Sequence, residues 1–213
     1  MNPSTPPAPR FTLLLKIGRV SNLPTVWTNV LAGACLAGLH TDLPQLLWVM
    51  LAITLFYTGG MYLNDAFDAD IDARERPSRP IPSGQISAKA VSAMGCAMLM
   101  AGIYIVAPYG MLAVQAGVAL SLAILLYNAW HKGNVWSPVI MGSCRALVYL
   151  LAAWTFAPDT PQALWWGMLA VFTHIAGLTY AAKQESLDRI DRLWPLAILA
   201  APLLIFMVFF NLP

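Results

Sequence analysis

Seven stretches of apolar residues, each roughly twenty residues long, follow one another along the chain. A helix needs about 20 consecutive apolar residues to cross a bilayer, so each stretch predicts one membrane-spanning helix. The stretches cover residues 20–39, 44–66, 89–107, 111–129, 136–156, 162–182 and 193–211. This pattern predicts an all-α fold, a polytopic transmembrane bundle of about seven helices.

The breaks between the stretches contain turn-forming or charged residues. Pro108 and Gly110 separate the third stretch from the fourth, and the sequence HKGN at 131–134 follows the fourth. Two breaks are longer and strongly charged, at 67–87 and 183–192. Because proline, glycine and polar clusters interrupt helices, the stretches are expected to form separate helices.

Composition supports a membrane protein with a single domain. Hydrophobic residues make up 59% of the 213 residues and charged residues only 10%, whereas soluble domains carry about 25% charged residues. We expect residues 1–18 to form a tail and juxtamembrane segment, and residues 19–213 to form one transmembrane domain. No basic surface lies outside the loops, so nucleic acid is not an expected partner.

Charge asymmetry predicts the orientation of the bundle. If seven helices alternate in direction, all twelve lysine and arginine residues fall on one side, and Arg145 lies within the fifth stretch toward that side. Every acid except Asp42 and Asp159 falls there too. Basic loops stay on the cytoplasmic side, which predicts a cytoplasmic N-terminus. We expect a bacterial inner membrane, with the charged side facing the cytoplasm.

The first candidate site is the acidic sequence that ends the second stretch. Asn64, Asp65, Asp68 and Asp72 form the pattern N-D-x-x-D-x-x-x-D. If the helix continues through this pattern, the three aspartates share one face, at positions i, i+3 and i+7. Carboxylates grouped beside a membrane repel one another, and Mg²⁺ is a cation that would offset this repulsion and also bind a diphosphate.

Arginines follow these acids directly, at positions 74, 76 and 79. The guanidinium group recognises phosphate oxygens with a planar fork, and Pro77, Pro80 and Pro82 predict an ordered loop in place of a helix. Acids and arginines in a loop can also merely pair and keep the loop solvated. The register of the acids at a helix end favours a site for an amphiphilic phosphorylated substrate.

These residues resemble the UbiA superfamily of intramembrane aromatic prenyltransferases. The resemblance lies in NDAFDADID at 64–72 and RPSRPIPSGQIS at 76–87, with weaker matches in RVSNLPTVWTNVLAG at 19–33 and YNAWHK at 127–132. It implies transfer of a prenyl group from a prenyl diphosphate to an aromatic or lipophilic acceptor, with Mg²⁺ bound at the cytoplasmic mouth of a helical bundle.

The resemblance also implies roles for individual residues. Asn64, Asp65, Asp68 and Asp72 would bind the magnesium diphosphate, and Arg79 and Lys132 would bind phosphate. The family carries a second aspartate motif after its sixth helix, where this chain has TYAAKQESLDRID at 179–191. We expect Glu185 and Asp188 to bind a second metal there, although an ordinary solvating loop is the alternative.

The family has nine helices, whereas this sequence supplies seven stretches. Either two helices are dispensable here, or a second subunit completes the bundle, or the sequence is part of a longer chain. The expected partners are a prenyl diphosphate, an acceptor that the sequence does not identify, and membrane lipid. Two alternative functions remain, a non-catalytic subunit that binds prenyl lipids and a small transporter.

Polar residues within the apolar stretches complete the candidate list. Asn22 and Asn29 share a helix face, and Asn22 is expected to line the substrate pocket, with hydrogen bonding between helices as the alternative. Arg145 could reach the diphosphate or extend to the interface, the more common outcome for a long cation. His131, as a loop residue, suggests no role.

Overall fold

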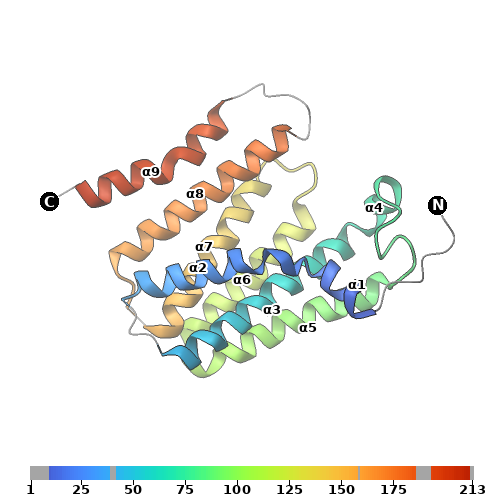
Figure 1. Cartoon of the computed structure of the whole chain (residues 1–213), viewed down its shortest axis with the longest axis horizontal. Coiled ribbons are helices and arrows are strands. Elements are labelled where there is room, and N and C mark those ends of the chain that lie inside the picture. Colours follow the sequence, from blue (N-terminus) through green and yellow to red (C-terminus); the bar gives the residue numbers. More distant parts are fainter. Residues whose placement is uncertain (1–9, 39–41, 158, 186–192, 212–213) are drawn as a thin grey trace.

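The computed structural model describes residues 10–38, 42–157, 159–185 and 193–211, and within these ranges the chain is helical without a strand (Figure 1). Seven helices match the seven apolar stretches: α2 Leu23–Leu36, α3 Leu43–Phe67, α5 Ala88–Val106, α6 Met111–Trp130, α7 Ser137–Phe156, α8 Gln162–Glu185 and α9 Trp194–Asn211. Two short helices, α1 Arg10–Ile17 and α4 Ala69–Glu75, are additional. The described ranges thus hold nine α-helices, two more than the sequence predicts.

Five of these helices are long and apolar enough to cross a membrane. They are α3, α5 with the turn that follows it, α6, α7 and α8, while α9 contributes a shorter apolar segment. Large apolar side chains such as Leu47, Trp48, Leu122 and Leu203 are exposed on the outside of the bundle. An outward apolar surface of this kind fits a lipid environment, because lipid takes the place of water around it.

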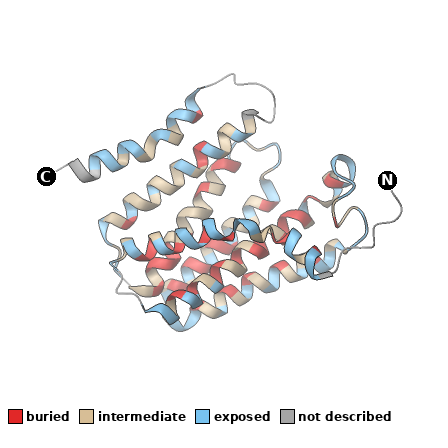
Figure 2. Cartoon of the chain, viewed as in Figure 1, coloured by how far each residue is buried: buried red, intermediate tan, exposed pale blue. Residues whose placement is uncertain are grey.

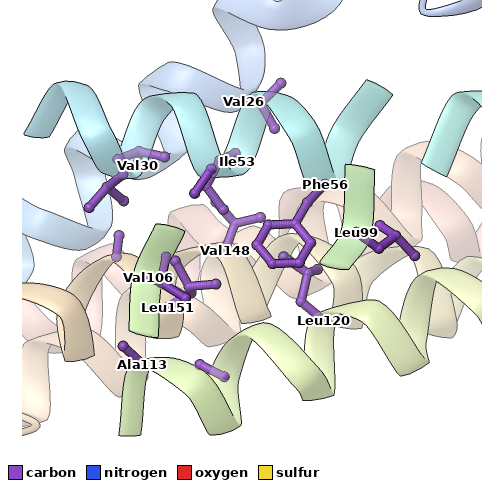
Figure 3. Close-up of a cluster of buried hydrophobic side chains, with 14 of the residues drawn as sticks. Val26, Val30, Ile53, Phe56, Leu99, Val106, Ala113, Leu120, Val148 and Leu151 are labelled. Atoms are coloured by element: carbon purple, nitrogen blue, oxygen red, sulfur yellow. The ribbon is translucent and has the colours of Figure 1, made fainter. Parts of the chain in front are cut away.

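The core lies among α2, α3, α5, α6 and α7. Figure 2 shows most buried residues in these helices, whereas α9 is largely exposed and packs on α8. Phe56 of α3 occupies the centre of the core, close to Leu99, Leu120 and Val148 from three other helices (Figure 3). The core therefore joins helices that are distant in the sequence around one apolar centre.

Helix starts are marked by the residues that the backbone requires there. Proline stands in the first turn of α2, α3 and α7, where its missing N–H is not needed. The Ser87 hydroxyl caps α5 by accepting a hydrogen bond of 3.2 Å from the Ala90 N–H, and Gly110 takes a φ of 110° before α6. These residues account for the close match between predicted and observed helix starts.

The α3–α4 and α6–α7 connections lie toward the same end of the bundle (Figure 1). An ion pair of 3.4 Å between Asp68 and Lys132 joins these two connections directly. The alternation of loops that the charge pattern predicts is therefore confirmed for these segments.

The segment before the first apolar stretch is partly helical. Helix α1 buries Leu13 and Ile17 against Tyr62 and Val91, and the Tyr62 hydroxyl donates a hydrogen bond of 3.1 Å to the Leu14 carbonyl oxygen. Residues 10–17 therefore pack against α3 and α5. Helix α1 ends at Ile17, and a tight turn follows it, in which the Arg19 N–H donates to the Lys16 carbonyl oxygen at 3.2 Å.

Glycine permits a close approach between α2 and α7. A Cβ atom at Gly33 would lie 2.7 Å from the carbonyl oxygen of Tyr149 and 2.8 Å from its Cα. Both are backbone atoms, so relief of the contact requires the two helices to separate.

We therefore expect Gly33→Ala to lower the free energy of unfolding by about 1–3 kcal/mol, the usual range for overpacking. Gly117→Ala is the matched control, because its Cβ would meet the Phe56 ring at an ordinary 3.4 Å. Thermal unfolding of the purified protein in detergent measures both variants. Equal stability of the two would contradict the close packing of α2 on α7.

Candidate active site

Three aspartates and one asparagine gather at the end of α3 and in α4. Asn64, Asp65, Asp68 and Asp72 are all buried, and we call them the acidic cluster. Burial of carboxylates needs compensation by cations or hydrogen bonds, and each of the three aspartates is paired with at least one basic side chain.

Asp65 is paired with two arginines. Its Oδ1 accepts a hydrogen bond of 2.9 Å from Arg19 Nη2, and Arg79 Nη1 lies 3.7 Å from the same oxygen. Arg19 has the positive φ of 46°, which no other non-glycine residue of the described ranges shares. This conformation is costly for a residue with a Cβ, and here it places the guanidinium against α3.

Asp72 is the most deeply buried of the acids, with 1% of its surface exposed. Its Oδ2 accepts a hydrogen bond of 2.5 Å from Arg79 Nη1. Its Oδ1 is buried without a hydrogen-bond partner, and Arg76 Nη1 lies 3.9 Å from it. One carboxylate oxygen therefore retains an unused capacity to bind a cation.

Asp68 faces the end of α6. Lys132 Nζ lies 3.4 Å from Asp68 Oδ2, and His131 Nε2 lies 3.6 Å from Asp68 Oδ1. The His131 ring stacks on Tyr127 with a centroid distance of 5.0 Å. The α6–α7 connection thereby provides a second set of basic groups, which pair with Asp68, whereas Arg19 and Arg79 pair with Asp65 and Asp72.

Asn64 links the acidic cluster to the interior of the bundle. Its Oδ1 accepts a hydrogen bond of 3.1 Å from Arg19, and its Nδ2 donates one of 3.2 Å to Asn128 Oδ1. Asn128 Nδ2 in turn donates to the Gly60 carbonyl oxygen at 3.1 Å. This chain of amides fixes the Asn64 side chain, because every group in it is satisfied.

The structure brings together six of the seven residues that the sequence proposes for the first site: Asn64, Asp65, Asp68, Asp72, Arg79 and Lys132. Asn22 lies apart from this network and lines the adjoining cavity. Of the proposed second site, Glu185 ends α8 and its side chain is outside the described residues, as is the whole of Asp188.

The expectation of one continuous helix through the acidic pattern is wrong. Helix α3 ends at Phe67, and Asp68 is both its C-cap and the N-cap of α4. The helical pattern is interrupted only at this one residue, because the Asp68 N–H still bonds to the Asn64 carbonyl oxygen at 3.0 Å and the Asp68 carbonyl oxygen accepts the Asp72 N–H at 2.8 Å. Asp65 and Asp72 share Arg79, whereas Asp68 is paired with Lys132 and His131.

Several residues of the site escaped the sequence reasoning. Arg19, Asn128 and His131 all contact the acidic cluster or its asparagine. Arg19 lies between α1 and α2, 45 positions from Asn64, and Asn128 lies on α6, 64 positions from Asn64. The signal that points to them is their place in RVSN at 19–22 and YNAWHK at 127–132, two sequences that also contain the proposed residues Asn22 and Lys132.

An apolar cavity of about 250 Å³ adjoins the acidic cluster. Arg19 and Asn128 belong both to its lining and to the hydrogen-bond network of the cluster. Its remaining walls are mostly apolar and come from α2, α3, α6 and α7. The volume is just below the ~300–1,000 Å³ of typical ligand pockets, and the cavity places an apolar space beside a charged site.

The donors of the acidic cluster suit a hard divalent cation. Carboxylate and amide oxygens are the ligands that Mg²⁺ prefers, and the unpartnered Oδ1 of Asp72 is one such donor without another use. As they stand, the carboxylates are held by basic side chains, and no three acidic, histidine or cysteine groups of the described residues are close enough to form a metal site. A bound metal would therefore exchange places with some of these cations.

Comparison with known proteins places this arrangement in a family. The family model of the UbiA prenyltransferase family matches residues 25–193, so the chain belongs to the UbiA prenyltransferase family. With the five candidate spans, it is a multi-pass integral membrane protein.

Among relatives, a digeranylgeranylglyceryl phosphate synthase of Methanopyrus kandleri is 31% identical over 76% of this chain and 59% of its own length. A protoheme IX farnesyltransferase of Korarchaeum cryptofilum is 31% identical over 72% of this chain and 48% of its own length. The chain thus spans about half the length of these relatives, both of which are archaeal.

Solved structures share the fold. A structure described as giving insights into digeranylgeranylglyceryl phosphate synthase in membranes has a TM-score of 0.79 at 19% identity, and it covers 95% of this chain and 78% of that chain. A UbiA homolog from Archaeoglobus fulgidus bound to GPP and Mg²⁺ has a TM-score of 0.68 at 16% identity, covering 83% and 65%. The predicted family and the all-α fold class are confirmed.

Proposed function

We propose that the chain is a Mg²⁺-dependent prenyltransferase, which moves a prenyl group from a prenyl diphosphate to a small acceptor. The observation that carries this proposal is the acidic cluster, surrounded by basic side chains and placed beside an apolar cavity. A prenyl diphosphate has the complementary chemistry, because it joins an anionic head to an apolar tail. The bound GPP and Mg²⁺ of the Archaeoglobus fulgidus homolog support the same assignment.

Asp65, Asp68 and Asp72 would hold Mg²⁺, with Asn64 as a neutral oxygen donor. When bound, Mg²⁺ neutralises the diphosphate as a leaving group and favours cleavage of its bond to the prenyl carbon. The buried Oδ1 of Asp72, which lacks a hydrogen-bond partner, is the donor most ready for this use. Glu185 and Asp188 remain proposed ligands of a second metal.

Basic side chains of the site would bind the phosphate oxygens. Four permanent cations, Arg19, Arg76, Arg79 and Lys132, form ion pairs with only three aspartates. These basic side chains favour the approach of an anionic head group. Arg79 and Lys132 are the proposed phosphate ligands, and they approach the acidic cluster from different sides.

The cavity would hold the reacting part of the prenyl group. Its apolar walls exclude water, which protects an electron-poor prenyl carbon from hydrolysis. Tyr57 and Tyr127 line this cavity, and aromatic rings stabilise a nearby cation by about 0.5–2 kcal/mol. Asn22 and Asn128 provide polar groups in the same lining, and Asn22 is proposed to orient the substrate.

The acceptor, the compartment and the assembly are proposed more generally. Relatives are named for glyceryl phosphate and protoheme compounds, and an aromatic or lipophilic acceptor is proposed here. The acidic cluster is proposed to face the cytoplasm. The bacterial inner membrane stays a prediction, as does a second subunit that completes the bundle.

A non-catalytic prenyl-lipid-binding subunit is the second candidate, because the segment at 179–191 lacks the aspartate pattern of the family's second motif. A transfer experiment separates the two. Vesicles containing the purified protein are incubated with labelled geranyl diphosphate, Mg²⁺ and a panel of phenolic and lipid acceptors. We expect label in the acceptor fraction together with release of diphosphate. Magnesium-dependent binding without either product would favour the non-catalytic subunit.

A further inference from the structure

Arg145 is a cation that the proposed chemistry of the acidic cluster does not use. It lies in α7, eight residues after the start of that helix, which is about 12 Å along the helix axis. Its side chain lines the apolar cavity between α2, α3, α6 and α7. Its Nη1 is buried and has no hydrogen-bond partner. The sequence alone favours an arginine that extends to the membrane interface, but the structure directs it into the bundle.

Among the described residues, the surroundings of Arg145 contain no acid that could serve as its counterion. The titratable groups that interact with it electrostatically are Tyr57, Cys144 and Tyr149, and phenols and thiols are neutral at pH 7. None of the ion pairs that join the acidic cluster to its cations includes Arg145. Within the part of the chain that the structure describes, its guanidinium is therefore not neutralised by any acid.

An isolated guanidinium inside a membrane protein is destabilising, because neither water nor an anion compensates its charge. Charged groups at such depth usually face a cavity and mark the path or the binding site of a ligand. Here the cavity is present, its other lining is mostly apolar, and the free nitrogen is available. A ligand that brings a negative charge into this cavity would compensate the arginine.

We propose that Arg145 binds an anionic group, a carboxylate or a phosphate, on the acceptor, and so selects acidic acceptors. This inference rests on the proposed transferase function. The diphosphate is a less suitable partner, because its site already has more permanent cations than aspartates and Arg145 takes no part in that network. A guanidinium fork binds both oxygens of a carboxylate or a phosphate at once.

The test compares benzoate and phenyl phosphate with benzyl alcohol, their neutral counterpart, as probes of the full chain in a neutral detergent. Wild type is expected to bind both anions at least tenfold more tightly than the alcohol, and Arg145→Met to lose this preference. Arg145→Lys keeps the positive charge but lacks the two parallel N–H donors of a guanidinium, so it should retain part of the preference for the anions. Lys89→Met removes an exposed cation at the start of α5 and should behave as wild type.

Two further measurements separate this role from others. Magnesium-dependent binding of geranyl diphosphate should change less than twofold in Arg145→Met, so the transferase proposal and this one can fail separately. The melting temperature of Arg145→Met without ligand should rise, because an uncompensated charge is removed. A structural arginine would instead lower it.

The proposal is overturned if wild type does not prefer the anions, or if Arg145→Met retains the preference. It is also overturned if the variant loses geranyl diphosphate binding, which would assign Arg145 to the diphosphate. A last experiment measures benzoate binding to the protein in nanodiscs, where added phosphatidylglycerol should not displace benzoate. Displacement by this lipid would identify a lipid headgroup as the occupant and contradict an acceptor site.

Discussion

Asp68→Asn is expected to weaken magnesium-dependent binding of geranyl diphosphate by roughly 100-fold or more, which corresponds to about 3 kcal/mol. The substitution keeps the size of the side chain and removes the charge that a magnesium ion requires. Asp68 is also the one acid of the cluster that is paired with the α6–α7 connection. Its loss therefore affects both the metal and the position of Lys132. Equilibrium binding of the labelled diphosphate, with and without Mg²⁺, measures the effect.

Asp70→Asn is the matched control for this prediction. Asp70 lies two residues further along the same segment, its side chain is exposed, and it forms none of the ion pairs of the acidic cluster. Both variants remove one negative charge from the same end of the bundle. Equal binding by Asp68→Asn and Asp70→Asn would show that the acidic cluster does not hold the metal diphosphate.

Arg79→Met has the second large expected effect. Arg79 is the cation that Asp65 and Asp72 share, and it is paired with the fully buried carboxylate of Asp72. Removing one partner of a buried ion pair costs about 3–5 kcal/mol, so the melting temperature should fall. Because Arg79 is also a proposed phosphate ligand, geranyl diphosphate binding should weaken roughly 100-fold, or by about 3 kcal/mol.

Arg79→Lys separates these two effects. The lysine retains the charge beside Asp72, so most of the stability should return, but it lacks the fork that can serve Asp65, Asp72 and a phosphate together. Binding should remain at least tenfold weaker than in wild type. Lys89→Met removes an exposed cation at the start of α5, and it should leave both the melting temperature and geranyl diphosphate binding unchanged. If Arg79→Lys bound geranyl diphosphate as tightly as wild type, Arg79 would contribute only its positive charge and not specific hydrogen bonds to a phosphate.

The long helices were predictable from the sequence because each one must be apolar over the thickness of a bilayer. Periodicity and composition within a single segment are enough to find them. The short helices α1 and α4 were not predictable in this way. Helix α1 has only eight residues, and isolated helices of this length are marginal in water. It is held by the contacts of Leu13 and Ile17 with distant residues of α3 and α5.

The site shows the same division between local and long-range information. Asn64, Asp65, Asp68 and Asp72 stand close together in the sequence, so their pattern alone indicated a candidate site. Arg19 and His131 did not stand out, because only the packing of α1 and α6 against α3 brings them to the acids. The proposed role of Arg145 could not be predicted from the sequence at all, because it depends on the cavity that the side chain lines and on the absence of an acid around it among the described residues.

The central claim is that the acidic cluster binds a prenyl diphosphate through magnesium. The most direct test is a titration of purified wild-type protein with labelled geranyl diphosphate at increasing Mg²⁺ concentration, followed by removal of the metal with a chelator. Saturable binding that appears with Mg²⁺ and disappears with the chelator is the predicted result. Binding that is independent of Mg²⁺, or no binding by a protein shown to be folded, would contradict the claim.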